Sequence, residues 1–236
     1  MSFFNPTEPI IRCKQEALDY QDRQGLLCLH LKVGQKTLFS GMYTRIDQVF
    51  VLWGLISAAI FITAQFAPIS WFIQAGLWSG LTVLGTVGMT VLTHFWVKVE
   101  RLRWVLYSWV GLMLAGVTLT DLSICLGWGQ ILMYLCHLWL GLSALGYLCT
   151  GLGMRSRAFT VASGVHLIGM CLLPYVGGWQ FLTTAMVMTT SLLVFAEVQW
   201  DMRPPADYDI LTAEQKQFNE RQYRLRQVAS LVEARS

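Results

Sequence analysis

The polar residues of this sequence that are best suited to chemistry lie inside long apolar segments. Asp121 is an acidic residue well inside one segment, and His137 follows it across a short turn. If both segments are membrane-spanning helices, a rise of about 1.5 Å per residue places these side chains at similar depth. Because charges are costly in hydrocarbon, such residues are candidates for function. The sequence predicts an Asp121–His137 pair, with solvation of both residues near the outer headgroups as the alternative.

His166 is a second candidate, because a histidine nitrogen can ligate the metal of a macrocycle. Its helical face would contain Ala158, Ala162 and Gly169, and small side chains leave room for a flat group. The sequence therefore names His166, together with His137, as candidate ligands of a haem or chlorophyll-type pigment. The alternative is that these small residues let membrane helices pack closely around a hydrogen-bonded histidine.

Ser143 lies at nearly the depth of His166 on the neighbouring segment, which raises nucleophilic catalysis as a hypothesis. The strings from Gly141 to Ala144 and from Gly164 to Gly169 resemble the serine and histidine motifs of rhomboid intramembrane proteases. That family has another span between its motifs, whereas only 22 residues lie between Ser143 and His166 here. The histidine and asparagine of the family's oxyanion region have no counterpart. Because of these departures, the sequence lacks the arrangement of residues that such catalysis requires. It therefore contains no catalytic signature.

Six apolar stretches must position these residues, and each is long enough to cross a hydrocarbon core of about 30 Å as a helix. The expected spans run from Asp47 to Ala67, Trp71 to Val97, Leu102 to Leu126, Gln130 to Met154, Ala158 to Tyr175 and Trp179 to Val198. A chain that is 55% hydrophobic and 13% charged exceeds what a soluble core requires. We expect an all-α, polytopic membrane protein with a flank over 1–46, a six-helix domain over 47–200 and a tail over 201–236.

The basic residues predict how this domain is oriented. All 17 Lys and Arg residues lie in the two flanks or at the loops that join spans two to three and four to five, with Arg103 as the second residue of span three. The other three loops contain none. By the positive-inside rule, both termini are expected on the cytoplasmic side or its equivalent. The net charge of +3 is too small to favour nucleic acid as a partner.

The two flanks carry further patterns. Alternating residues from Leu27 to Phe39 predict a small β-hairpin, with an irregular segment on the headgroups as the alternative. After the Pro204-Pro205 stop, Thr212 and Gln215 form a capping-box pattern that predicts a polar helix over 213–233. Its apolar seam suits contact with a partner or with this chain's own N-terminal flank, and consists of Leu211, Phe218, Leu225, Val228 and Val232.

These patterns favour a non-enzymatic accessory, assembly or scaffold protein. It would contact other integral membrane proteins, or a second copy, through its flanks and through small-residue helix faces such as that of Gly76 and Gly80. Transport of a small solute or ion by an oligomer is one alternative, although the middle of the spans lacks the prolines that break transporter helices. Binding of haem or pigment through His166 or His137 is the other alternative. The six cysteines form no close CxxC pair and are expected to be free thiols.

Overall fold

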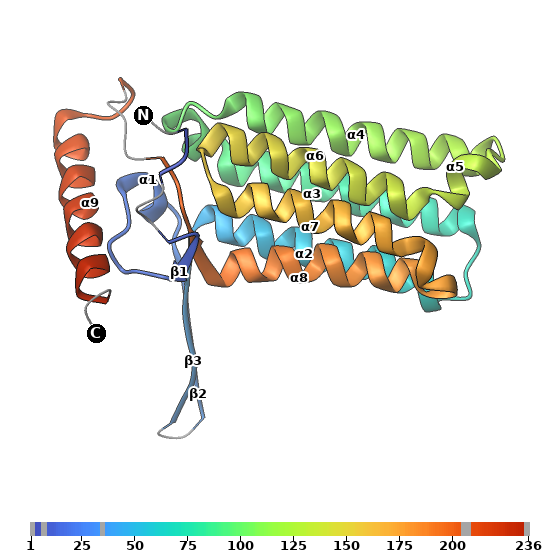
Figure 1. Ribbon diagram of the computed structural model, residues 1–236, viewed down its shortest axis with the longest axis horizontal. Coiled ribbons are helices and arrows are strands. Elements are labelled where there is room, and N and C mark those ends of the chain that lie inside the picture. The colour runs from blue at the N-terminus through green and yellow to red at the C-terminus, as the bar shows by residue number, and fades with distance from the viewer. Residues whose placement is uncertain (1–2, 6–8, 34–35, 204–208, 234–236) are drawn as a thin grey trace.

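In the computed structural model, long helices run side by side as one bundle, and both ends of the chain lie at the same end of it (Figure 1). The structure describes residues 3–5, 9–33, 36–203 and 209–233. Six helices are long and apolar enough to cross a membrane, so the chain is a multi-pass membrane protein. They are α2 (Arg45–Phe66), α3 (Trp71–Val99), α4 (Arg103–Cys125), α6 (Leu135–Met154), α7 (Arg157–Leu172) and α8 (Gln180–Glu197).

The spans differ from expectation mainly at their ends. The fourth is broken at Tyr134, so that a short helix α5 (Gly129–Met133) precedes α6. Two 3-10 turns, η1 (Leu173–Tyr175) and η2 (Gly177–Trp179), connect α7 to α8. Helix α8 ends at Glu197 because the next residues form a strand, β4 (Val198–Trp200). The predicted stop at Pro204 and Pro205 lies outside the described residues.

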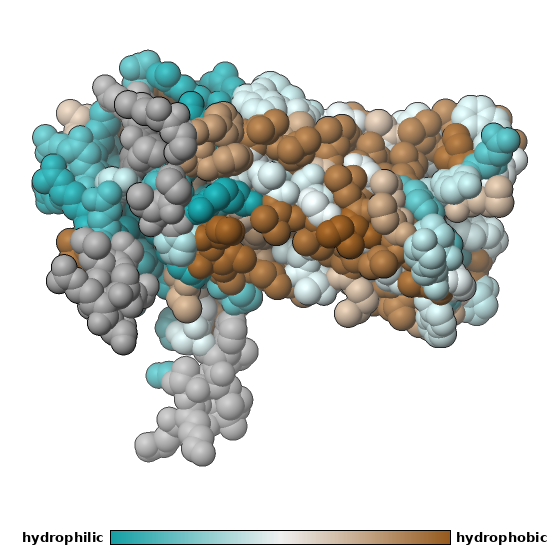
Figure 2. Space-filling model, viewed as in Figure 1, coloured by the Kyte–Doolittle hydropathy of each residue, from teal (hydrophilic) through white to brown (hydrophobic). Residues whose placement is uncertain are grey.

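The six helices close into a ring. Each packs on its neighbours in the order α2, α3, α4, α6, α7 and α8, and α8 returns to α2. Small residues let large aromatic rings pack against the backbone of a neighbouring helix. A Cβ atom on Gly146 would come within 2.5 Å of the Trp109 ring, and a Cβ atom on Gly116 would come within 2.8 Å of the Trp139 ring. On the face that Figure 2 shows, apolar residues cover the middle of the bundle, and hydrophilic residues gather most densely at the end that holds the termini.

We call the structure at that end the cap, meaning the described residues before α2 and after α8. Strand β1 (Ile11–Cys13) pairs antiparallel with β4, which ties the N-terminal flank to the end of α8. A short helix, α1 (Tyr20–Arg23), follows β1. Helix α9 (Ala213–Glu233) lies across the end of the bundle (Figure 1).

Both patterns predicted in the flanks are confirmed. Strands β2 (Leu27–Val33) and β3 (Lys36–Tyr43) form an antiparallel hairpin that projects sideways from the bundle (Figure 1). At the start of α9, the backbone N–H of Thr212 donates to Oε1 of Gln215 at 3.0 Å. The backbone N–H of Gln215 donates to Oγ1 of Thr212 at 3.3 Å, which completes the capping box.

Candidate functional site

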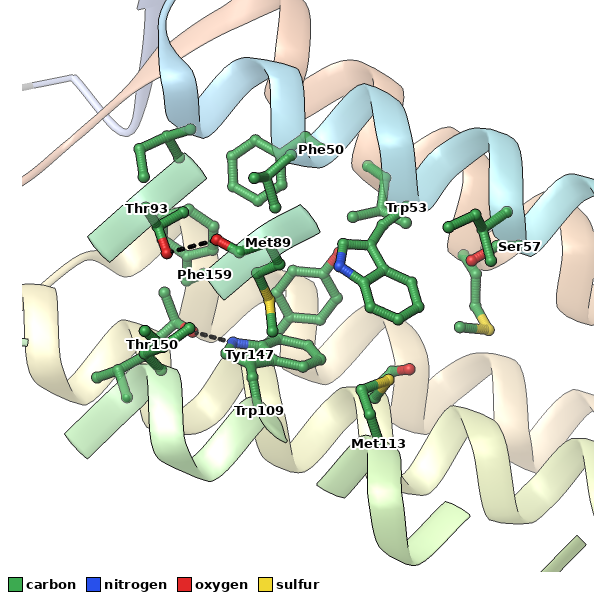
Figure 3. A pocket seen from close by; sticks show the side chains of 18 of the residues that line it. Phe50, Trp53, Ser57, Met89, Thr93, Trp109, Met113, Tyr147, Thr150 and Phe159 are labelled. Atoms are coloured by element: carbon green, nitrogen blue, oxygen red, sulfur yellow. Dashed lines mark hydrogen bonds between the residues drawn. The ribbon is translucent and has the colours of Figure 1, made fainter. Parts of the chain in front are cut away.

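An apolar cavity of about 140 Å³ lies inside the ring, and all six spanning helices contribute to its wall. Aromatic rings and methionines dominate that wall (Figure 3), among them Phe50, Trp53, Met89, Trp109, Met113 and Phe159. An apolar cavity of this size stays dry and takes a guest about as large as benzene. The interior of the ring therefore has space for part of an apolar molecule.

Polar side chains also interrupt this wall, and four of them lie at similar depth on three different helices. They are Trp53 on α2, Ser143 and Tyr147 on α6, and His166 on α7. Counting about 1.5 Å per residue from the capped ends of these helices, all four lie roughly 10 to 17 Å deep. Trp53 and Tyr147 both project from their helices into the cavity (Figure 3). Further hydroxyl groups line the cavity, on Ser57, Thr82, Thr93 and Thr150.

His166 lines this cavity and has one ring nitrogen that is unpaired among the described residues. Its side chain is 0% exposed, and Nδ1 lies 2.9 Å from the carbonyl oxygen of Ala162. Because a carbonyl only accepts hydrogen bonds, Nδ1 carries the proton of the neutral ring and Nε2 is left as an acceptor. The ring of Tyr147 packs beside the imidazole, with centroids 4.8 Å apart.

Two of the polar atoms are buried without compensation. Within the part of the chain that the structure describes, neither Nε2 of His166 nor the indole Nε1 of Trp53 has a hydrogen-bond partner. Leaving a buried polar group unpaired costs about 1–3 kcal/mol. The cavity therefore offers one unused acceptor and one unused donor to a guest.

A haem or chlorophyll-type pigment fits this site only in part. The lone pair of His166 suits axial ligation of a macrocycle metal. The space does not suit it, because a cavity of about 140 Å³ takes a benzene-sized group and not a tetrapyrrole. His137 is not among the residues that line the cavity. Over the described residues, no group of three or more His, Cys, Asp or Glu side chains could hold a metal ion.

The structure places Asp121 against a different helix from the one that the sequence suggested. The hydroxyl of Ser79 on α3 lies 2.9 Å and 2.8 Å from the two carboxylate oxygens of Asp121. Nδ1 of His137 is buried with no partner among the described residues, and its ring meets Tyr134 edge-on at 5.2 Å. Coupling between Asp121 and His137 therefore stays a prediction, whereas the bond to Ser79 is observed.

Ser143 and His166 line the same cavity, but in the described part of the chain no hydrogen bond joins them. Nδ1 of His166 is occupied by the Ala162 carbonyl, and Nε2 has no hydroxyl to accept from. A serine nucleophile requires a base within hydrogen-bond reach. The structure thus offers no serine–histidine couple of the kind found in rhomboid proteases.

A second, polar cavity of about 120 Å³ lies in the cap directly beside the first. Ile46 and Trp96 line both cavities. The indole Nε1 of Trp96 donates to Oδ1 of Asp22 at 2.8 Å, so this ring stands between the apolar and the polar space. Burial and the nearby Asp19 carboxylate raise the pKa of Asp22 to about 7, against a smaller lowering by the Trp96 hydrogen bond.

Asp201 joins the cap to the start of α7. Its carboxylate accepts from the Ser156 hydroxyl at 2.9 Å, from the Arg157 side chain at 2.8 Å, and from the backbone N–H groups of Arg157 and Ala158 at 3.0 Å. Burial acts to raise the pKa of Asp201, but these donors outweigh it and hold the pKa below its usual value. A carboxylate at a helix N-terminus is favourable because it pairs with the free N–H groups there.

The predicted seam of α9 divides into two parts. Leu211 is buried against Val99 and Tyr20, and Phe218 lies under the guanidinium of Arg23 at 5.0 Å. Leu225 and Val228 are 56% and 60% exposed, while the side chain of Val232 lies outside the described part of the structure. The first half of α9 therefore packs on this chain's own cap, and the second half leaves two apolar side chains open.

Trp53 and Tyr147 were missed by sequence reasoning, because an aromatic residue inside an apolar stretch gives no signal that its polar atom is unpaired. Ser79 gave no such signal either, since serine is common in membrane helices.

Comparisons of this chain with protein-family models, with curated proteins and with solved structures find no match.

Proposed function

We propose that this chain is a membrane-embedded binding protein that holds an apolar molecule of the bilayer inside its ring of six helices. The observation that carries this proposal is the cavity of about 140 Å³ at whose wall two buried polar atoms lack partners in the described part of the chain. Membrane proteins gain stability from close packing of their helices. A ring that keeps space and unpaired polar atoms at its centre is therefore better explained by a guest than by packing alone.

The wall is suited to an apolar guest for a physical reason. Aromatic, methionine and aliphatic side chains make most of it, and aromatic rings and methionines are adaptable contact partners for hydrocarbon or ring systems. The cap covers one end of the ring with charged and hydrogen-bonded groups. A water-soluble ion or sugar would lose its hydration in such an interior without sufficient compensation.

We further propose that the cap is cytoplasmic, because the basic residues gather there. Epitope tags placed at Ser2 and at Ser236 should be reached by an impermeant label only from the cytoplasmic side. A tag at Ser236 labelled from the outside in intact cells would overturn this orientation.

The binding proposal is tested by purifying the protein in mild detergent, recording its absorption spectrum and identifying co-purifying molecules by mass spectrometry. We expect one apolar compound at close to equimolar amount. The variant Ser57→Leu adds apolar volume to the cavity wall and should lose this compound. Gly111→Leu is the matched control, since a Cβ there meets no atom within 4 Å, so the added side chain extends away from the ring. Equal retention by both variants would refute the proposal.

An accessory or assembly role is a second candidate, supported by a different surface. Gly76 and Gly80 on α3 are exposed, and a Cβ at either position would meet nothing within 4 Å. Glycines four residues apart let a partner helix approach closely. Leu225 and Val228 add an open apolar patch on α9.

This role predicts a stable complex with another membrane protein or a second copy. Gly80→Leu should reduce the size of that complex on native gels, while Leu225→Ser with Val228→Ser should weaken contacts made through the cap. Gly111→Leu again serves as the control, because it adds similar bulk to a different helix. A complex unchanged by all of these substitutions would remove the accessory proposal.

A further inference from the structure

We infer that the molecule held in the ring carries a hydroxyl group that donates to Nε2 of His166 and accepts from the indole N–H of Trp53. This inference rests on the proposed binding function and specifies the chemistry of its guest. It starts from two buried atoms that have no partner among the described residues and that belong to residues lining one cavity.

The hydrogen-bonding roles of the two atoms are fixed. Nδ1 of His166 is engaged with the Ala162 carbonyl at 2.9 Å, so Nε2 is the acceptor of the neutral ring. The indole nitrogen of Trp53 is a donor only. A guest that satisfies both must therefore offer one donor and one acceptor, and a hydroxyl offers both on a single oxygen.

Other guest chemistries satisfy the site less well. A ketone or quinone oxygen accepts from Trp53 but leaves Nε2 of His166 unpaired. A carboxylate or an ammonium group would bring a charge into the ring at a cost that a neutral donor and acceptor do not offset. A metal macrocycle would use the lone pair of His166 but exceeds the cavity of about 140 Å³. A neutral apolar alcohol remains the guest class that fits.

The depth of the two residues shows why a protein is needed to hold such a group. Trp53 and His166 lie roughly 12 and 14 Å from the capped ends of α2 and α7. In free lipid, a hydroxyl at this depth has no hydrogen-bonding partner, so an apolar alcohol keeps its oxygen at the headgroups. Inside the ring, His166 and Trp53 supply the missing partners, with the Tyr147 ring packed against the imidazole.

Three probes of equal size test the inference: hexan-1-ol, 1-methoxypentane and heptane, each with seven non-hydrogen atoms. The alcohol donates and accepts, the ether only accepts, and the alkane does neither. Binding is followed in detergent as the rise in Tm, read from tryptophan fluorescence at equal amounts of probe per micelle. The cavity-filled variant Ser57→Leu gives the background from probe dissolved in the micelle.

In the wild-type protein, we expect an apparent affinity for hexan-1-ol about tenfold above that for 1-methoxypentane, the usual value of one buried hydrogen bond, and a larger advantage over heptane, which makes neither bond. His166→Leu should abolish the advantage of the alcohol over the ether while heptane still binds. Trp53→Phe should reduce the advantage of both oxygen-containing probes over heptane. If His166→Leu fails to fold, the affinities of the three probes for the wild type and for Trp53→Phe test the hydroxyl inference.

The outcomes separate this inference from the function on which it rests. If the three probes bind the wild type equally, as they would if a water molecule filled the polar level, the hydroxyl inference is overturned and apolar binding stands. A preference for the alcohol that persists in both variants also overturns it. If no probe raises the Tm of the wild type above the Ser57→Leu background, the binding function fails as well.

Discussion

At the capped end of the bundle, buried carboxylates are surrounded by donors, whereas in the centre of the ring two buried polar atoms have none among the described residues. Asp47 accepts from Lys14 at 2.8 Å, and Glu100 accepts from Gln21 at 2.8 Å. Asp201 receives four hydrogen bonds. In the ring, Nε2 of His166 and Nε1 of Trp53 are buried without a partner in the described part of the chain, and both residues line the cavity.

This contrast separates polar groups that hold the structure together from groups that are available to a guest. A satisfied buried network makes the arrangement of its elements specific, and loss of one member is costly. An unsatisfied group stabilises nothing by itself, so its removal costs little. The paired carboxylates at the capped end therefore have the character of a structural lock, although Gln15 Oε1 and Arg203 Nε in the cap also lack partners among the described residues, and the ring has the character of a site.

The largest effect is expected from breaking the cap at Asp201. Asp201→Ala leaves the start of α7 and the buried side of Arg157 without their acceptor, and should destabilise the protein by about 3–5 kcal/mol. Because the folded pKa of Asp201 is lowered, its contribution is fully present at pH 7 and is lost only as the pH falls below the ordinary aspartate range near 4. The measurement is Tm in mild detergent at pH 7.

The matched control is Asp209→Ala, because Asp209 is 88% exposed and pairs with Arg101 at the surface. This substitution should leave Tm nearly unchanged. A small effect of Asp201→Ala, similar to that of the control, would show that the cap does not lock α7.

The next largest effect concerns Asp22, the one cap carboxylate here whose pKa is raised to about 7. A folded pKa above the unfolded value near 4 means that folding favours the protonated acid. Stability should therefore fall as the pH rises from about 4 to 7, by up to about 4 kcal/mol. Asp22→Asn mimics the protonated acid and still accepts from Trp96, so its Tm should match that of wild type near pH 4, exceed it slightly at pH 5 and exceed it clearly at pH 8.

Asp209→Asn serves as the control for this titration, since it removes an exposed carboxylate and should leave the pH profile unchanged. A wild-type profile that Asp22→Asn does not flatten would place the titration on another group. In that case Asp22 would be ionised in the folded cap, and the difference between the paired carboxylates of the cap and the unpaired atoms of the ring would be larger.

A moderate effect is expected at Asp121, where sequence and structure name different partners. The double-mutant cycle of Asp121→Ala with Ser79→Ala should give a coupling of about 1 kcal/mol, because one observed hydrogen bond is removed by either change. The cycle of Asp121→Asn with His137→Gln should give a coupling below about 0.5 kcal/mol. A larger coupling with His137 would restore the pair that the sequence predicted.

The smallest effect is expected from His166→Leu in protein stripped of its guest. Replacing the ring by an apolar side chain loses the Nδ1 bond to the Ala162 carbonyl but also removes Nε2, which has no partner among the described residues, so stability should change by less than about 0.5 kcal/mol, or increase. Tm of delipidated protein provides the measurement, with Asp201→Ala as the contrasting variant. A loss above about 2 kcal/mol would mean that His166 acts as a structural residue, like the carboxylates of the cap.

Some features of this protein follow from local sequence. Six apolar stretches gave six spanning helices, because length and hydropathy alone decide whether a helix can cross a bilayer. The hairpin over Leu27–Tyr43 and the start of α9 were predictable, because strand alternation and a capping box act within a few residues. His166 was named as a candidate from its small-residue face.

Only the tertiary structure decided which faces of these helices meet. Lipid and protein interior are both apolar, so a membrane helix carries little pattern that tells its buried side from its lipid side. The closure of the ring, the unpaired indole of Trp53 and the choice of Ser79 as the partner of Asp121 all depend on that packing. The same holds for Asp201, which lies 44 residues beyond Arg157 in the chain and reaches it only when the cap folds over the bundle.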